Sequence, residues 1–216
     1  MQPRLVIFDF DGTLADSFPW FRGALNEVGR KHGLRPVAAA EVEALRRLGT
    51  REILRELQVS PWRLPGLARD LRALKAAAAG TIPLFPGVPE MLRGLAAGGL
   101  RLAIASSDSA ASIRRTLGPA AAAVGPVAGG ASLFGKAAKL RQVLRAAAVP
   151  PEAAIYVGDE TRDAEAAASA GIAFGAVTWG YASPVALLAR QPAQVFDAPS
   201  EILRLLDGAG SIREEP

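Results

Sequence analysis

Three short apolar segments constrain the fold of this chain more than any other feature of its sequence. Each contains β-branched or aromatic residues, which is typical of a buried strand, and they occupy residues 4–8, 101–105 and 153–157. Each is followed at once by acidic or hydroxyl residues and then by a helical pattern. Strands that alternate with helices predict an α/β fold with a parallel sheet and helices on both faces.

The sequence between the first two of these segments has a different pattern. From about residue 17 to residue 80 apolar residues recur at helical spacing, with a break at Gly49, and no strand pattern appears. The chain has 216 residues, a length between one and two domains. We therefore expect a Rossmann-like core of residues 1–16 and 81–216, with an all-α cap of residues 17–80 inserted into it.

Two stretches of the chain carry no charged residue. One lies between Arg115 and Lys136, and the other between Glu165 and Arg190. The second is longer than the ~20 residues that span a bilayer. Both stretches contain glycine and proline, and both are rich in alanine in place of leucine and isoleucine runs. We interpret them as buried strands and turns, and we expect no membrane partner.

Composition argues against several other classes of protein. The net charge of +4 comes from scattered bases with no block of like charge, which favours solvated helix faces over nucleic-acid binding. The chain has no cysteine, which excludes disulfides, thiolate metal sites and thiol nucleophiles. The first residues form only a short apolar run followed by acids, unlike a signal peptide. A cytoplasmic protein is expected.

Reactive side chains collect at the ends of the three expected strands. Asp9 and Asp11 follow the first strand, Ser106 follows the second, and Asp159 and Asp163 follow the third. Ligands bind outside the carboxyl ends of parallel strands, so these side chains are expected to share one site. Clustered carboxylates repel one another unless a cation compensates them. An oxygen-only set of ligands suits Mg²⁺ better than zinc.

These motifs together resemble those of the haloacid dehalogenase-like phosphohydrolases. DFDGTLADS at residues 9–17 is similar to the first motif of that family, and GDETRD at residues 158–163 is similar to its acidic GDxxxD element. Ser106 and a lysine near residue 136 lie between them in the family's order. A helical insertion directly after the first motif resembles the members of the phosphoglycolate phosphatase and β-phosphoglucomutase type. The short segment from Ser106 to Lys136 leaves no room for the large cap that other branches insert there.

The resemblance implies roles for the acidic residues. Asp9 is expected to attack phosphorus and form an aspartyl-phosphate. Asp11 is expected to protonate the leaving oxygen and then to take a proton from the hydrolytic water, while Gly12 lets the backbone turn between them. The Asp9 carboxylate, the Asp11 carbonyl and Asp159 are expected to hold Mg²⁺, with Asp163 close by.

The resemblance also implies a group of phosphate-binding residues. The Ser106 hydroxyl and the backbone N–H of Ser107 are expected to bind phosphoryl oxygens. A lysine is expected to hold both the phosphoryl group and the nucleophile, and either Lys136 or Lys139 has a suitable position in the sequence. Lys136 is favoured because it follows Gly135 at a predicted helix start, whereas Lys139 is interpreted as an exposed helix residue.

Four further residues have both a functional and a structural interpretation. His32 lies in the helical insertion, where a surface or packing role is more common than a metal-binding one. Arg162 is expected to be a solvated partner of nearby acids. Thr50 and Arg51 are candidate substrate contacts in a cap loop. The alternative is that Thr50 caps a helix and Arg51 is solvated.

The function expected from these observations is Mg²⁺-dependent hydrolysis of a small phosphorylated metabolite. Asp11 argues against dehalogenation, because that reaction has no phosphate leaving group to protonate. Alternatives are a phosphosugar mutase, a phosphonatase and a non-catalytic phosphate-binding regulatory module that would have lost a catalytic acid or the lysine. A phosphonatase of this family uses a cap lysine as a Schiff base, but Lys31 and Lys75 are both expected on solvated helix faces.

Overall fold

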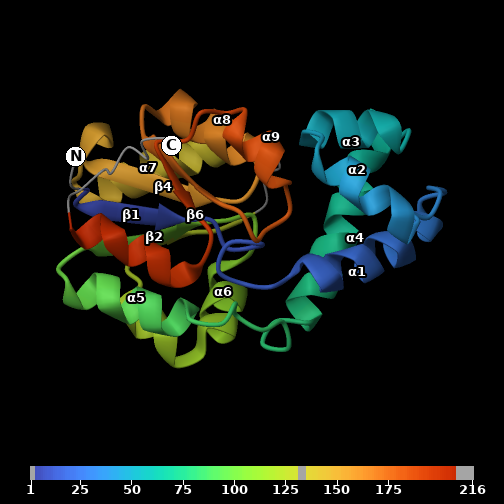
Figure 1. The fold of residues 1–216 in the computed structure, drawn as a ribbon. Coiled ribbons are helices and arrows are strands. Elements are labelled where there is room, and N and C mark those ends of the chain that lie inside the picture. The colour runs from blue at the N-terminus through green and yellow to red at the C-terminus, as the bar shows by residue number, and fades with distance from the viewer. Residues whose placement is uncertain (1–2, 131–134, 208–216) are drawn as a thin grey trace.

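A six-stranded parallel sheet forms the centre of the protein (Figure 1). The computed structural model describes residues 3–130 and 135–207. Within them the strand order is β3-β2-β1-β4-β5-β6. The strands are β1 (Leu5–Phe8), β2 (Arg101–Ala105), β3 (Val127–Ala128), β4 (Ala154–Gly158), β5 (Ala173–Val177) and β6 (Gln194–Phe196). The predicted α/β fold is confirmed. β6 was not predicted, and β3 was predicted only as part of a stretch of buried strands and turns, because runs of two or three residues give no periodic signal.

Helices cover both faces of the sheet, because both faces of the strands are apolar. In β1, Leu5 and Ile7 pack on one side, while Val6 and Phe8 pack on the other. The first face is covered by α7 (Lys136–Ala147), α8 (Thr161–Ala170) and α9 (Pro184–Leu188). The second is covered by α5 (Val88–Ala97), α6 (Ala110–Leu117), the 3₁₀ helix η3 (Gly118–Ala123) and the 3₁₀ helix η5 (Pro199–Leu206). One layer of helices on each face of the sheet therefore encloses β1, all of whose residues are buried.

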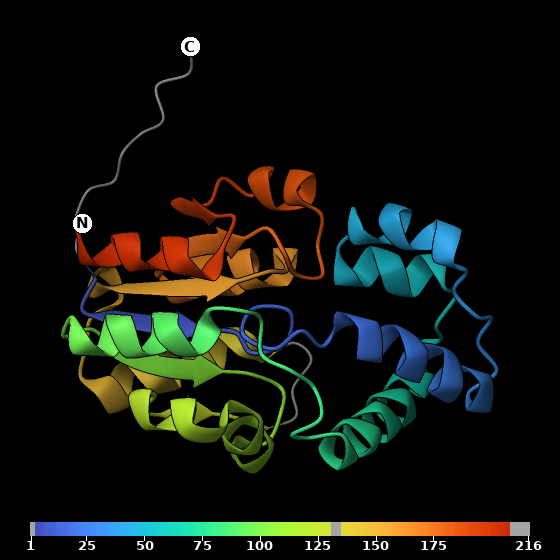
Figure 2. The same ribbon diagram turned by 60° about the horizontal axis from the view of Figure 1, so that its bottom comes forward.

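A separate helical unit lies beyond the carboxyl ends of the strands (Figure 2). Its α-helices are α1 (Phe18–Lys31), α2 (Val42–Arg46), α3 (Thr50–Glu56) and α4 (Leu64–Ala77). Two 3₁₀ helices, η1 (Ala39–Glu41) and η2 (Pro61–Arg63), connect them. As the sequence predicted, no strand occurs between the first and second strands of the chain in this described segment. We refer to residues 18–77 as the helical unit and to the rest of the described chain as the core.

Two adjacent backbone segments connect the helical unit to the core. The chain leaves the core at Asp16, whose N–H donates to the carbonyl of Pro83 at 2.9 Å. The chain re-enters the core next to this point, where the N–H of Phe85 donates to the carbonyl of Leu14 at 3.0 Å. The only covalent links between the two parts therefore run side by side, next to the first motif.

The two charge-free stretches contain short elements of the core. The first holds η3 and β3, with residues 131–134 outside the described part of the chain. The second holds the second half of α8 and all of β5 and α9. Among the described residues no helix has both the length and the apolar character to cross a membrane. The helix predicted over residues 200–206 is the 3₁₀ helix η5.

Candidate active site

Asp9 is fixed where β1 ends. Its backbone N–H donates to the carbonyl of Val157 on β4 at 2.8 Å, which continues the strand pairing by one residue. Its side chain is 3% exposed and accepts a hydrogen bond from the N–H of Phe10 at 2.8 Å. The Nζ of Lys136 donates to the other carboxylate oxygen at 2.6 Å. Asp9 is thus a buried carboxylate whose orientation is fixed by three contacts: the pairing of its backbone with β4, the N–H of Phe10 and the Nζ of Lys136.

Gly12 allows the chain to turn tightly beside this carboxylate. Its φ of +75° lies in the left-handed region that favours glycine. A Cβ atom there would lie 2.2 Å from the Oδ2 of Asp159. Glycine is therefore required at this position by both the backbone and the neighbouring acid.

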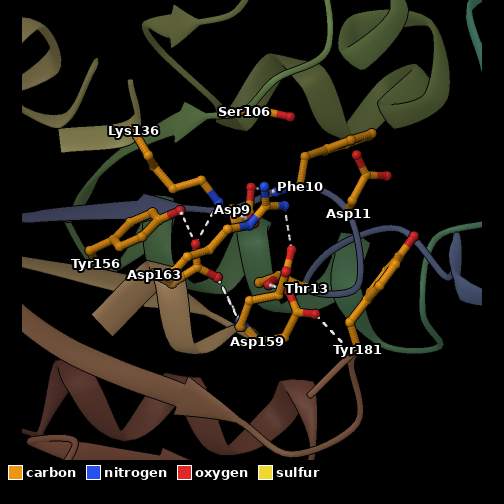
Figure 3. Close-up of polar contacts among 12 residues, drawn as sticks. Asp9, Phe10, Asp11, Thr13, Ser106, Lys136, Tyr156, Asp159, Asp163 and Tyr181 are labelled. Atoms are coloured by element: carbon orange, nitrogen blue, oxygen red, sulfur yellow. Dashed lines mark hydrogen bonds and ion pairs between the residues drawn. The ribbon is translucent and has the colours of Figure 1, made fainter. Parts of the chain in front are cut away.

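Asp9 shares the site with two carboxylates from the end of β4 and the start of α8. Ligand oxygens of Asp9, Asp159 and Asp163 lie within 4.8 Å of one another, and all three residues are buried (Figure 3). Thr13 Oγ1 donates to Asp159 at 2.6 Å, and the N–H of Tyr181 donates to its other oxygen at 2.7 Å. These contacts fix the Asp159 carboxylate at the first motif.

The Asp163 carboxylate closes the first turn of α8 and faces Lys136. One of its oxygens accepts the N–H groups of Asp159 at 3.1 Å and of Glu160 at 3.0 Å. The other oxygen accepts from the Nζ of Lys136 at 2.5 Å and from the hydroxyl of Tyr156 at 3.2 Å. Lys136 therefore bridges Asp9 and Asp163; its expected contact with a phosphoryl group stays a prediction.

The charges in this cluster are not balanced by the protein alone. Burial raises the pKa of Asp9 to about 7; Asp163 adds to this rise, and Lys136 opposes it. Burial, together with Glu160 and Asp163, raises the pKa of Asp159 well above its ordinary value. A divalent cation would restore the balance, and these hard, buried oxygen donors fit Mg²⁺.

Ser106 lies across β1 from Asp159, because β2 and β4 flank β1 in the sheet (Figure 3). Ser106 is 1% exposed, and its hydroxyl accepts the N–H of Asp108 at 3.2 Å. Lys139 donates from Nζ to the carbonyl of Ser106 at 2.5 Å and also contacts the carbonyl of Gly130. The interpretation of Lys139 as an exposed helix residue is therefore wrong: it supports the loop that carries Ser106.

Asp11 points away from the acidic cluster and pairs with a lysine of the helical unit. Lys75, near the end of α4, contacts the Asp11 carboxylate, and its Nζ lies 2.7 Å from the Oδ2 of Asp108. The Lys75 side chain is only 14% exposed, so the expected solvated position is wrong. Burial alone lowers the pKa of Lys75, but Asp11 and Asp108 outweigh burial and raise it.

The sequence contained a partial signal for Lys75. The apolar residues Leu64, Leu67 and Leu71 precede it at spacings that place all four on one face of α4. A lysine that continues an apolar face is a candidate for burial, but nothing local identifies its partners. Asp108, two residues after Ser106, was missed for the same reason.

The remaining candidate site residues differ in where the structure places them. Thr50 lines a cavity between the helical unit and the core, as does Ser107, whereas Arg51 is exposed and does not line it. Gly49, not Thr50, is the N-cap of α3. Arg162 pairs with Glu160 but is not fully solvated, since its Nε is buried without a hydrogen-bond partner.

His32 lies outside this site, in agreement with its expected structural role. Its Nε2 is 3.0 Å from the Oδ2 of Asp70, so the contact joins α4 to the residue that follows α1. The ring is partly buried within the helical unit. The metal-ligand set formed by the described residues accordingly contains carboxylates and no histidine.

Comparisons with known proteins agree with this geometry. A family model described as "Haloacid dehalogenase-like hydrolase" matches residues 6–177. A phosphoglycolate phosphatase from Synechococcus elongatus is 34% identical over 203 residues, which cover 93% of this chain and 96% of that protein. The tyrosine-protein kinase PtkA of Mycobacterium tuberculosis is 35% identical over 194 residues, covering 83% of this chain and 64% of PtkA.

A solved structure shows the same fold. A haloacid dehalogenase-like family hydrolase from Streptococcus pneumoniae superposes with a TM-score of 0.78 at 24% sequence identity. The match covers 94% of this chain and 97% of that one. The similarity therefore extends over the core and the helical unit together.

Proposed function

This chain belongs to the haloacid dehalogenase-like hydrolases, and on that premise we propose that it is a Mg²⁺-dependent phosphomonoesterase acting on a small phosphorylated molecule. The observation that carries the proposal is the arrangement around Asp9. A buried carboxylate at a strand end contacts one lysine and lies beside two further carboxylates. Such a set can hold a cation and a phosphate at the same point.

The first step is attack by Asp9. One oxygen of its carboxylate forms a bond to phosphorus, and the bond from phosphorus to the leaving oxygen breaks. Asp11 donates a proton to the leaving oxygen, which departs as an alcohol. Lys136 holds Asp9 in position and lies where its charge meets the phosphoryl oxygens.

The second step releases phosphate. Asp11, now ionised, takes a proton from water, and the water oxygen bonds to phosphorus as the acyl-phosphate bond to Asp9 breaks. Ser106 and the backbone N–H of Ser107 bind the phosphoryl oxygens through both steps. The carbonyl contact from Lys139 keeps the Ser106 loop against the site.

Mg²⁺ is the cofactor that we propose. The side chains of Asp9, Asp159 and Asp163 and the backbone carbonyl of Asp11 would hold it. When bound, it supplies positive charge that compensates the buried carboxylates and the phosphate. The contacts from Thr13 and Tyr181 to Asp159 keep that ligand oriented.

We further propose that the helical unit, residues 17–80 in the sequence division, is a cap over this site. It lies beyond the strand ends, and Lys75 reaches from α4 to Asp11. A cap excludes bulk water from the phosphoryl group and carries contacts to the rest of the substrate. Thr50 is a candidate for such a contact because it lines the cavity between the two parts.

Lys75 does not favour a phosphonatase. A Schiff-base lysine must lose its proton to act as a nucleophile, and enzymes achieve this by lowering its pKa. The pKa of Lys75 is raised by its two carboxylate partners. A mutase uses the same first step but returns the phosphoryl group to a sugar hydroxyl, so it produces an isomer in place of free phosphate.

A second candidate function is phosphoryl transfer to a protein hydroxyl, because one relative is named a tyrosine kinase. The chain covers 64% of that relative but 96% of the phosphoglycolate phosphatase. Hydrolysis therefore comes first. Incubation with ATP and a tyrosine-containing peptide tests the second candidate directly.

The proposal is tested with a panel of phosphate monoesters that includes 2-phosphoglycolate. Phosphate release is expected with Mg²⁺ and is expected to stop when a chelator removes it. The variant Asp9→Asn should fold and bind Mg²⁺ weakly but release no phosphate. Intact metal binding with no release from any ester would favour a regulatory module instead.

A further inference from the structure

The β5–α9 loop, residues 178–183, lies directly against Asp159. The N–H of Tyr181 donates to the Oδ2 of Asp159 at 2.7 Å (Figure 3). The N–H of Ala182 donates to the backbone carbonyl of Asp159 at 3.2 Å. A Cβ atom on Gly180 would overlap the Asp159 side chain, so the loop can approach this closely only with glycine there. Because Asp159 is a proposed Mg²⁺ ligand, the loop supports the proposed metal site.

Arg46, the last residue of α2, holds the other side of the same loop. Its Nη2 donates to the carbonyl of Gly180 at 2.9 Å, and its Nε donates to the carbonyl of Tyr181 at 3.0 Å. Its own backbone carbonyl accepts the N–H of Ser183 at 2.8 Å. The Arg46 side chain is only 21% exposed, so water competes little for these contacts. Three hydrogen bonds therefore join the end of α2 to this loop of the core.

The guanidinium of Arg46 is also oriented from within the helical unit. Its Nη1 lies 2.9 Å from the Oε1 of Glu43, one turn earlier on α2. Its Cζ lies 5.4 Å from the ring centroid of Phe18 at the start of α1. The planar group is thus held from both sides with two of its donors aimed at the loop.

Two consecutive peptide groups connect Arg46 to Asp159. The peptide between Gly180 and Tyr181 accepts from Arg46 through its carbonyl and donates to Asp159 through its N–H, and the peptide between Tyr181 and Ala182 does the same. Every peptide bond of the described residues is trans, so each C=O points opposite to its N–H. A cation at the carbonyl polarises the peptide and strengthens its N–H as a donor.

The start of α1 packs on the same loop through Tyr181. The Tyr181 ring lies 5.0 Å from the ring of Phe18 and 5.4 Å from the ring of Phe21, measured between centroids. Its hydroxyl lies 3.0 Å from the Oγ of Ser17. The position of this loop therefore depends on how the helical unit docks against the core.

We propose that Arg46 is a positioning residue for the metal site. It acts on Asp159 through the two peptide groups, so that the protein binds Mg²⁺ more tightly when the helical unit is docked on the core. This inference rests on the proposed Mg²⁺-dependent function and deepens it. By linkage, Mg²⁺ must favour docking by the same factor by which docking favours Mg²⁺.

The sign of the effect separates positioning from simple electrostatics. Through space alone, the positive charge of Arg46 repels a divalent cation, so removal of that charge would tighten Mg²⁺ binding. Loss of the two hydrogen bonds to the loop predicts the opposite, because Asp159 is then held less firmly.

The test is the dissociation constant for Mg²⁺, measured by isothermal titration calorimetry on protein freed of metal. Arg46→Met removes the guanidinium, and we expect the Kd to rise about tenfold. Arg47→Met removes the same charge from the next residue, which is exposed, and its Kd should stay within about twofold of the wild-type value. Melting temperatures without metal verify that both variants fold.

Hydrogen exchange of the wild-type protein tests the reciprocal effect. The N–H of Ser183 is bonded to Arg46 across the contact, so it exchanges when the helical unit separates from the loop. We expect Mg²⁺ to slow this exchange by at least about fivefold. The N–H of Gly125, bonded to the carbonyl of Leu102 inside the core, provides the control and should change less.

The outcomes separate this inference from the proposed function. An unchanged or lower Kd in Arg46→Met, or equal rises in Arg46→Met and Arg47→Met, would overturn the inference and leave the phosphatase intact. If wild type binds no Mg²⁺, the proposed function is itself contradicted, and the inference with it. If Arg46→Met does not fold, the exchange of Ser183 decides, and no slowing by Mg²⁺ would overturn the inference.

Discussion

The core and the helical unit bury their apolar residues very differently. In the core, alternate residues of β1 are completely buried on both faces of the sheet, so Asp9 follows a strand that is packed on both sides. In the helical unit, several apolar side chains of α3 and α4 face a cavity and are only partly buried. The difference fits the proposed function: the charged groups around Asp9 need a packed frame, whereas a unit proposed to lie over the substrate can leave apolar side chains facing a cavity.

The largest predicted effect is the loss of turnover when Asp9, which the core holds in place, is substituted. Asp9→Asn keeps the size of the side chain but removes the nucleophile, so kcat should fall by at least about a thousandfold. Melting temperature without metal should not fall, because a buried charge is removed with it. Phosphate release and thermal melting measure the two effects. A variant with near wild-type turnover would exclude Asp9 as the nucleophile.

The site residues that lie at the strand ends of the core could be predicted from the sequence, for a physical reason. Parallel strands bring their carboxyl ends to one edge, so Asp9, Ser106 and Asp159 had to meet once the strands were recognised. Lys75 and Asp108 could not be paired in this way. Their contact depends on how α4 docks against the core, which no local pattern encodes.

A second core test compares two glycines that both have positive φ. Gly12→Ala places a Cβ against the Asp159 carboxylate, so we expect kcat/KM to fall by about a hundredfold as that ligand is displaced. Gly99→Ala has the same kind of backbone strain, but no atom lies within 4 Å of the added Cβ. The control should lose about 1–2 kcal/mol of stability and keep its activity. Equal activity losses would mean that strain alone explains Gly12.

The buried charge of the core also predicts a pH effect. The folded pKa of Asp9 is about 7 against an ordinary value of 3.8, so the folded state retains a proton that the unfolded state releases between these values. Without metal, the stability that Asp9 contributes is therefore complete below about pH 4 and is lost as pH rises to about 7. Wild type should melt about 5 °C or more below Asp9→Asn at pH 8, with a smaller difference at pH 5.

Mg²⁺ should reduce this difference at pH 8, because it compensates the ionised carboxylate. Melting curves with chelator and with Mg²⁺ at the two pH values provide the comparison. Parallel pH dependences for wild type and Asp9→Asn would show that Asp9 does not carry the unbalanced charge.

The smallest predicted effect concerns the contact between the two regions. Lys75→Met removes the ammonium group that Asp11 and Asp108 share, and the two carboxylates then repel each other. Since all three side chains are at least four-fifths buried, we expect a loss of about 1–2 kcal/mol in unfolding free energy. Lys31→Met, at the exposed end of α1, should change it by less than about 0.5 kcal/mol. Denaturant unfolding gives both values, and equal losses would exclude a stabilising ion pair at Lys75.

The central claim is that chemistry takes place on Asp9 of the core. Its most direct test is an acid quench of the wild-type protein during turnover with a phosphate ester and Mg²⁺, followed by mass spectrometry of the peptides. We predict a phosphoryl group on the peptide that contains Asp9, and none in Asp9→Asn. Turnover with the phosphoryl group on a different residue, or with unlabelled Asp9 at every quench time, would contradict the account.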